Sequence, residues 1–267
     1  MNIVILANRD LASNYALNLL LPDLSQHNVS VFLSAKVGGS GSKPAELNNL
    51  AFFEQKLFNQ ILSLLFEKLP SYQGFKTFSQ MSRSLLQPVT ELNDINSPLG
   101  LAKVVKLQPE LILSIRYGSI LKEEVLALPR LGVLNLHSGL LPDYRGVMAT
   151  FWAMLNGEKT IGTTLHYIDD ASIDTGRIAG QSHLKVQPEK SYLWHVLQLY
   201  LGGVNLLIDA VVTLENEAQL TTTEQQGGQY YSFPDTEALK RFADKQLYLV
   251  NEDELTAFML EYYTNPH

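Results

Sequence analysis

Gly132-Val-Leu-Asn-Leu-His137 is the stretch of sequence that decides the fold class. It is short, mainly apolar and preceded by Pro129, a pattern typical of a strand that is buried on both faces of a parallel sheet. The run Leu111–Ile115 has the same character, and helical patterns lie before and between the two. Buried strands that alternate with helices predict an α/β fold with a Rossmann-like, mostly parallel open sheet and helices on both faces.

The N-terminal part of the sequence continues this alternation. Residues 2–7 and 29–33 are predicted strands, and the apolar pattern of residues 11–21 predicts a helix between them that ends at Pro22. A longer amphipathic helix, which Pro70 ends, is predicted from apolar residues at three- and four-residue spacing, namely Leu50, Phe53, Leu57, Ile61 and Leu64. Residues 71–96 follow no clear pattern.

Ser97-Pro98 is a cap followed by a proline, so a helix should run from there to about Leu107, and another short helix is expected near residues 121–128. After residue 137 we expect a loop and then further elements at approximate positions, namely a helix at 147–155, strands at 163–168 and 178–186, and a Ser191-capped helix to 214. The last forty residues are too few for a core of their own. We therefore predict a catalytic domain at 1–226 and a short C-terminal extension at 227–267, packed on that domain.

The composition narrows the chemistry before any motif is considered. The chain has 267 residues, 46% of them hydrophobic, no cysteine and a formal charge of −7. The lack of cysteine removes disulfides, thiolate metal sites and thiol nucleophiles, and the negative charge disfavours nucleic-acid backbones and anionic membranes as partners. The N-terminus lacks a secretory signal, and residues 196–214 include Gln198, Asn205 and Asp209, so we expect a cytoplasmic protein in which this stretch is a core helix.

Several familiar motifs are incomplete. The glycine-rich segment 36–43 has Ser42 before its lysine and Pro44 after it, so we interpret it as a mobile surface loop rather than a phosphate loop. The first turn after a strand, residues 8–12, has no glycine and so lacks the dinucleotide fingerprint. The histidines have no zinc-ligand spacing, and the acidic residues at 169–174 lack the calcium-loop pattern, so we expect no metal site.

One group of polar residues is a candidate catalytic site. Side chains alternate along a strand, so Asn135 and His137 share a face at its C-terminal end, where open α/β sheets bind ligands. An amide beside an imidazole, with Asp174 as the nearest plausible carboxylate, suits acyl transfer in which the substrate supplies the nucleophile. The alternative is a hydrogen-bonded polar pair that holds the following loop in shape.

The same residues carry a resemblance to a known family. Residues 135–146, Asn-Leu-His-Ser-Gly-Leu-Leu-Pro-Asp-Tyr-Arg-Gly, together with 161–168 and Ile173-Asp-Thr-Gly176, strongly resemble the folate-dependent formyltransferases. The resemblance implies that Asn135 polarises the formyl oxygen and that His137 stabilises the tetrahedral intermediate and takes part in proton transfer. It implies that Asp174 orients His137 or an ordered water. The implied formyl donor is 10-formyltetrahydrofolate, without a metal.

The resemblance also implies a folate pocket and an acceptor side. Main-chain groups would meet the pteridine at Tyr117, Gly118, Ile120, Leu121, Asp169, Asp170 and Ile173. Candidate substrate contacts are Arg116, Ser138, Gly139 and Arg145. For Arg116 a structural ion pair is an equal alternative, and Arg145 could instead anchor its loop. Family members usually have serine at position 139, so a loop hydroxyl is missing here. We interpret His166 and Trp152 as core rather than pocket wall.

The resemblance leaves the formyl acceptor open. The leading hypothesis is an enzyme that formylates an amine of a small molecule, such as an amino sugar, an amino acid or a hydroxylamine-type precursor. The charge of −7 and the short C-terminal part favour such an acceptor over tRNA. The alternatives are a formyltetrahydrofolate hydrolase, a methionyl-tRNA formyltransferase-like enzyme and a non-catalytic folate-binding protein. The sequence leaves the oligomeric state open.

Overall fold

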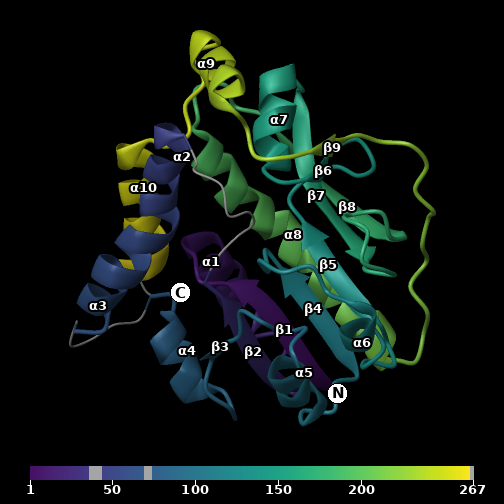
Figure 1. Cartoon of the computed structure of the whole chain (residues 1–267). Coiled ribbons are helices and arrows are strands. Elements are labelled where there is room, and N and C mark those ends of the chain that lie inside the picture. The colour runs from purple at the N-terminus through teal and green to yellow at the C-terminus, as the bar shows by residue number, and fades with distance from the viewer. Residues whose placement is uncertain (36–43, 69–73, 265–267) are drawn as a thin grey trace.

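A seven-stranded sheet forms the centre of the protein in the computed structural model, which describes residues 1–35, 44–68 and 74–264 (Figure 1). Its order is β3-β2-β1-β4-β5-β7-β8. The strands are β1 (Asn2–Asn8), β2 (Asn28–Ser34), β3 (Thr90–Glu91), β4 (Leu111–Ile115), β5 (Val133–His137), β7 (Thr160–Tyr167) and β8 (Ile178–Lys185). A small second sheet pairs β6 (Arg145–Gly146) with β9 (Tyr230–Tyr231).

The first five strands of the large sheet run parallel, and β7 and β8 complete it in antiparallel pairs. The predicted α/β fold with a mostly parallel sheet is therefore confirmed. Strand β5, whose sequence decides the fold class, is parallel to β4 on one side and antiparallel to β7 on the other. The chain adds β2 and β3 on one side of β1 and then adds β4 and β5 on the other side of β1. The strand order therefore reverses between β1 and β4. Ligands of open α/β sheets bind at such a reversal.

Two layers of helices cover the sheet. The larger core lies on the face of α1 (Leu11–Leu20) and α8 (Tyr192–Glu215), where alternate residues of β1 and β4 are buried. The smaller core lies on the other face, where α5 (Pro98–Val105) and α6 (Glu123–Leu126) pack on residues such as Ile112 and Val133. Helix α8 is long and apolar enough to cross a membrane, but half of its most apolar stretch is buried and it packs on α1, β7 and β8. It is therefore a core helix, as predicted.

The long helix predicted after residue 50 exists, but part of its predicted apolar face is wrong. It consists of α2 (Ala45–Ala51), the π-helix η1 (Phe52–Leu62) and α3 (Ser63–Phe66) in direct succession. Ile61 and Leu64 are 46% and 53% exposed, whereas Phe58 and Phe66 are buried. A π-helix has more residues per turn than an α-helix, so the buried side moves away from the α-helical spacing on which the prediction rested.

The segment without a clear pattern contains one helix and one short strand among its described residues. Helix α4 (Phe78–Ser84) starts with a capping box in which Thr77 and Gln80 satisfy each other's backbone amides. Strand β3 then pairs with the end of β2 at Phe32 and Leu33. Residues 36–43, which we interpreted as a surface loop, lie outside the described residues, and so do Pro70 and residues 71–73.

The C-terminal residues return to the main core. After α8 the chain runs past β8 to β9 (Figure 1) and continues into α9 (Thr236–Asp244), α10 (Glu252–Met259) and η2 (Leu260–Thr264). Phe242 of α9 stacks on Phe151 of α7 (Ala149–Asn156), with ring centroids 4.5 Å apart. The fully buried Tyr263 donates a hydrogen bond to Asn14 Oδ1 at 2.6 Å. The last helices therefore bury their apolar faces against the larger core.

Candidate functional site

The end of β5 presents Asn135 and His137 toward one face of the sheet. Leu134 and Leu136 belong to the larger core, whereas Val133 belongs to the smaller one, so the strand alternates as the sequence predicts. Asn135 lies opposite Ser114 of β4 and His166 of β7, and His137 lies opposite Thr164. This register brings two polar side chains of β5 next to a histidine of the neighbouring strand.

Asp174 reaches the same place from the turn between β7 and β8. Its Oδ2 lies 3.4 Å from His137 Nδ1 and accepts a hydrogen bond of 2.8 Å from the Gly146 amide. The backbone of Asp174 is left-handed, with φ of 54°, which is uncommon for a residue other than glycine. The carboxylate therefore bridges the imidazole of β5 and the loop that follows this strand.

The second nitrogen of His137 is also engaged. Its Nε2 lies 2.7 Å from the carbonyl oxygen of Tyr144, which can only accept, so Nε2 carries a hydrogen. In the neutral ring Nδ1 is then an acceptor, and in the protonated ring Nδ1 donates to Asp174. The ring can therefore exchange a proton at Nδ1 while its orientation stays fixed through Nε2.

His166 belongs to this cluster, a role that the sequence alone did not reveal. It is buried, as expected, but its Nε2 lies 3.0 Å from Asn135 Nδ2 and 3.4 Å from Asp174 Oδ1. Its Nδ1 lies 2.8 Å from the Tyr167 carbonyl, so Nδ1 donates and Nε2 accepts from the Asn135 amide in the neutral ring. The pairing register reveals this role, because β7 places His166 directly opposite Asn135.

The surroundings of Asp174 favour its ionised form. Burial alone would raise the pKa of this carboxyl, but the charge of His137, the hydrogen bond and charge of His166, and the Gly146 amide outweigh burial. Together they lower the pKa of Asp174 to about 2. Asp174 is therefore a carboxylate over the whole neutral range, as a residue that orients an imidazole requires.

The loop after His137 is packed too tightly for a side chain at Gly139. A Cβ there would lie 2.5 Å from Ala149 Cβ and 2.7 Å from His137 Nε2. Thr164 fixes the loop from the neighbouring strand, since its hydroxyl donates to Gly139 O and accepts from the Leu141 amide. The serine that family members usually have at this position does not fit in this backbone. Ser138 is half-buried, and its carbonyl accepts from the Thr150 hydroxyl.

The segment after β4 offers main chain and one apolar side chain to the site. The Tyr117 hydroxyl donates to Leu92 O, and Leu121 is buried in the smaller core. The amide of Gly118 donates to Ser34 Oγ at 2.9 Å. Ile120 is 55% exposed. Of these four predicted folate contacts, only Ile120 therefore presents an exposed side chain.

The turn before Asp174 is held by its own acidic side chains. Asp169 pairs with Arg177 at 2.9 Å, and this partner lowers the pKa of the Asp169 carboxyl. Asp170 accepts a hydrogen bond from the Ser172 amide at 2.7 Å. Ile173 is 39% exposed. Both carboxylates thus shape the turn, which leaves Ile173 as the exposed apolar side chain next to Asp174.

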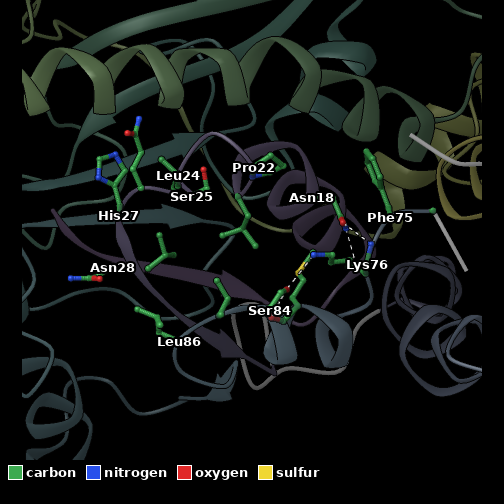
Figure 2. Close-up of a pocket in the computed structure, with 16 residues that line it drawn as sticks. Asn18, Pro22, Leu24, Ser25, His27, Asn28, Phe75, Lys76, Ser84 and Leu86 are labelled. Carbon is green, nitrogen blue, oxygen red and sulfur yellow. Dashed lines mark hydrogen bonds between the residues drawn. The ribbon is translucent and has the colours of Figure 1, made fainter.

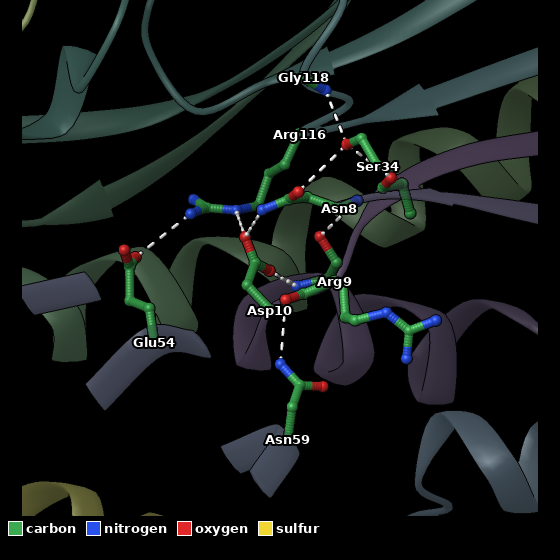
Figure 3. A network of polar contacts seen from close by, with 10 residues as sticks. Asn8, Arg9, Asp10, Ser34, Glu54, Asn59, Arg116 and Gly118 are labelled. Atoms are coloured by element: carbon green, nitrogen blue, oxygen red, sulfur yellow. Dashed lines mark hydrogen bonds and ion pairs between the residues drawn. The ribbon is translucent and has the colours of Figure 1, made fainter. Parts of the chain in front are cut away.

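The sequence left two roles open for Arg116, a substrate contact and a structural ion pair. In the structure Arg116 forms ion pairs. It follows β4 with φ of 60°, and its side chain binds Asp10 at 2.9 Å and Glu54 at 3.2 Å (Figure 3). Asp10 also caps α1 through the Ser13 amide. This buried network fills the place where the strand order reverses between β1 and β4. It ties β4, α1 and η1 together.

Arg145 is anchored in a different way. Its Nη2 donates to the carbonyl of Gly228 at 3.0 Å, and its Nε is buried without a hydrogen-bond partner. No acidic side chain of the described ranges lies within ion-pair distance of it. The guanidinium thus holds its loop to the C-terminal segment.

A separate hollow of about 820 Å³ lies between α1, α4 and the start of β2 (Figure 2). Its walls are mainly apolar, and Lys76 and His27 are among the residues that line it. None of the predicted site residues lines this hollow. The cluster around Asp174 and this hollow are therefore different places in the fold.

The part of the chain that contains the cluster is similar to a known sequence family. Residues 76–193, which include Asn135, His137, His166 and Asp174, match the model of the formyl transferase family. The sequence is 38% identical over 128 residues to the methionyl-tRNA formyltransferase of Synechococcus sp. (strain JA-3-3Ab), a match that covers 48% of this chain and 39% of that protein. The chain spans less than half the length of the curated relatives that it matches.

Solved structures share the fold over more of the chain. A sugar N-formyltransferase from Shewanella sp. FDAARGOS_354 superposes with a TM-score of 0.55 at 18% identity, covering 89% of this chain and 79% of that one. An N-formyltransferase from Helicobacter canadensis, in complex with folinic acid and dTDP-3-aminofucose, superposes with a TM-score of 0.55 at 19% identity. That match covers 87% of this chain and 71% of the other. At these identities the likeness is one of fold.

Proposed function

Because residues 76–193 match the model of the formyl transferase family, we propose that the chain transfers the formyl group of 10-formyltetrahydrofolate to an amine of a small-molecule acceptor. The observation that carries the proposal is the convergence of Asn135, His137 and Asp174 at the end of β5. The reaction joins the acceptor nitrogen to the formyl carbon, breaks the bond from that carbon to the donor nitrogen, and moves the amine proton to the donor. Tetrahydrofolate is the second product.

Each residue of the cluster has a role in this reaction. Asn135 donates an amide hydrogen to the formyl oxygen as negative charge develops there, and His166 holds this amide in place through its other hydrogen. His137 moves the proton between acceptor and donor at Nδ1, since Nε2 is bound to Tyr144. Asp174 stabilises the charged imidazole and fixes its direction.

The surroundings of the cluster fit a folate donor. Ile120 and Ile173 are large exposed apolar side chains in the two segments predicted to hold the pteridine. These residues, with main-chain groups of the two segments, would hold the donor, and the donor would supply the activated formyl group.

Two observations bear on the acceptor. The Helicobacter canadensis structure contains an amino-sugar nucleotide beside folinic acid, and the charge of −7 on this chain disfavours tRNA. The Synechococcus relative, a methionyl-tRNA formyltransferase at 38% identity, favours methionyl-tRNA as the second candidate acceptor. We place a small-molecule amine first, in a protein that works in the cytoplasm. Arg145 is the cation that could bind an anionic group of such an acceptor.

Transfer of isotopically labelled formyl groups tests this proposal. The protein is incubated with labelled 10-formyltetrahydrofolate and, in separate reactions, with an amino-sugar nucleotide, an amino acid, hydroxylamine and charged initiator tRNA. We expect label in a small amine product. Label only in tRNA would show that tRNA, and not a small amine, is the acceptor. Label only in free formate would show that the protein is a hydrolase.

A further inference from the structure

The C-terminal segment Thr223–Ser232, here called the strap, runs beside the site from the edge of the large sheet to the small sheet. At one end Thr223 pairs with Ile178 of β8 through two backbone hydrogen bonds of 2.9 Å. At the other end Tyr230 and Tyr231 pair with Arg145 and Gly146. Figure 1 shows the chain leaving the end of α8 and passing beside β8 to reach β9, and the strap is the later part of this path. The strap therefore joins the Asp174 turn to the loop after His137.

Gln225 is the contact of the strap with the Asp174 turn. Its Nε2 donates to the carbonyl of Asp174 at 3.1 Å and to the carbonyl of Gly176 at 2.6 Å. Gly176 is pressed against β7 from the other side, since a Cβ there would lie 1.9 Å from the Tyr167 carbonyl. The amide of Gln225 thus binds two carbonyls of this turn. The left-handed backbone conformation of Asp174 costs free energy, so the surrounding contacts must hold it in place.

The strap also fixes the amide that binds the Asp174 carboxylate. The Arg145 amide donates to Gln229 O at 2.9 Å and the Val147 amide to Tyr231 O at 2.8 Å, so Gly146 lies between two strap contacts. A Cβ on Gly146 would lie 2.2 Å from Tyr231 O, which shows how closely the two backbones approach. Because the Gly146 amide donates to Asp174 Oδ2, the strap controls both the backbone and the carboxylate of Asp174.

A third contact of the strap is with Tyr144, the residue that binds His137. Tyr231 stacks on Tyr144 at 5.5 Å and on Trp152 at 5.1 Å between ring centroids. The carbonyl of Tyr144 accepts the hydrogen bond from His137 Nε2. The strap thus reaches both partners of the pair formed by Asp174 and His137, although it lies about fifty residues beyond Asp174 in the sequence.

We propose that the strap is a positioning element of the site and that Gln225 is the positioning residue through which it holds the carboxylate of Asp174 against His137. The inference rests on the proposed function, since positioning matters only for a reaction at this cluster. Residues 226–230 are exposed and add little to the core. Loss of the Gln225 amide should therefore disturb the alignment of Asp174 without unfolding the protein.

Two substitutions of Gln225 and one matched control test the proposal. Gln225→Ala removes both hydrogen bonds, and Gln225→Glu keeps the size of the side chain but turns acceptors toward two carbonyls. We expect both to lower kcat at least about tenfold, since a small misplacement of a reacting group is costly, while KM for the donor stays close to wild type. Gln226→Ala changes the exposed neighbour and should behave as wild type. The two Gln225 variants should stay folded but melt about 2–6 °C lower, since two hydrogen bonds are lost.

A second measurement does not depend on turnover. Nuclear magnetic resonance of carbon-13-labelled aspartate, assigned with Asp174→Asn, reports the pKa of Asp174, which is about 2 in the intact site. We expect Gln225→Ala to raise this pKa toward the ordinary value, because the carboxylate moves away from His137 and the Gly146 amide. An unchanged titration together with wild-type kcat in Gln225→Ala would overturn the proposal. If the wild type transfers no formyl group, the proposed function fails, and the titration alone still decides whether Gln225 positions Asp174.

Discussion

Asn135, His137 and Asp174 come from two segments of the chain, and the sequence points to the two segments by different patterns. The alternation of a buried strand placed Asn135 and His137 on one face, because two polar side chains in an apolar strand need partners. Asp174 is the nearest plausible carboxylate in the sequence, and the resemblance implies its role. His166 was missed, because the residue opposite Asn135 depends on the register of β5 and β7, which a single sequence does not determine.

The pKa of Asp174 predicts a pH-dependent stability. Its pKa is about 2 in the folded protein, below the value of 3.8 for a free aspartate, so the folded state gains stability from the ionised form. This gain is complete above about pH 4 and is lost as the pH falls through about 2, and it amounts to about 2 kcal/mol. Urea unfolding of wild type and Asp174→Asn at pH 6, 4 and 2 measures it. The advantage of wild type should shrink by that amount between pH 4 and 2, and a constant difference would contradict the assigned surroundings.

The tight packing around Gly139 predicts that the serine usual in the family would lower stability and activity here. Gly139→Ser places a Cβ against Ala149 and His137, so we expect a loss of about 1–3 kcal/mol in the free energy of unfolding and a lower turnover. Gly180→Ala is the matched control, because a Cβ there would meet only the end of the Leu206 side chain at 3.2 Å. Denaturant unfolding compares the two. A Gly139→Ser variant as stable and active as wild type would show that the loop after His137 is not packed as described.

At the scale of elements, most helices and strands follow from periodicity, and the exceptions have physical causes. The helix that Ser97 caps begins at Pro98 as predicted, because the cap and the proline both mark a helix start. The face of η1 could not be predicted, because a π-helix changes the number of residues per turn and no residue pattern announces it. Strand β3 has only two residues and depends on its pairing with β2.

The network around Arg116 predicts how strongly three elements depend on one side chain. Arg116 is 16% exposed, Asp10 is fully buried and Glu54 is 12% exposed. Arg116→Met would leave two buried carboxylates without their cation, so we expect a loss of about 3–5 kcal/mol in the free energy of unfolding, measured by denaturant titration. Arg177→Met removes the cation of a pair whose members are both 40% exposed, and should cost at most about 1 kcal/mol. A stable Arg116→Met with a raised KM would instead assign Arg116 to substrate binding.

At the scale of the whole molecule, the parallel sheet brings the site together and the C-terminal residues complete its surroundings. The fold class followed from the order of buried strands and helices. The path of the strap could not be predicted, since residues 216–229 have no periodicity and their position depends on contacts with the Asp174 turn and with the loop after His137. The division of the chain at residue 226 stays a prediction, although residues on both sides of it share the larger core.

The absence of cysteine and the charge of −7 also belong to this scale. A transfer in which the substrate amine is the nucleophile needs no thiol, and a small acceptor needs no basic surface. The site is then built from uncharged and acidic groups around one exchangeable proton on His137. The proposed mechanism therefore requires that formyl transfer at this cluster takes place only when an amine acceptor is present.

The most direct test is the rate of tetrahydrofolate release from 10-formyltetrahydrofolate, measured with and without an amine acceptor in wild type and in Asn135→Ala. We predict that release by wild type requires the amine, and that Asn135→Ala loses about 10²–10³-fold in kcat while still binding the donor, because it lacks the amide that stabilises the developing charge. Release that is independent of every amine, or an Asn135→Ala variant as fast as wild type, would contradict this mechanism.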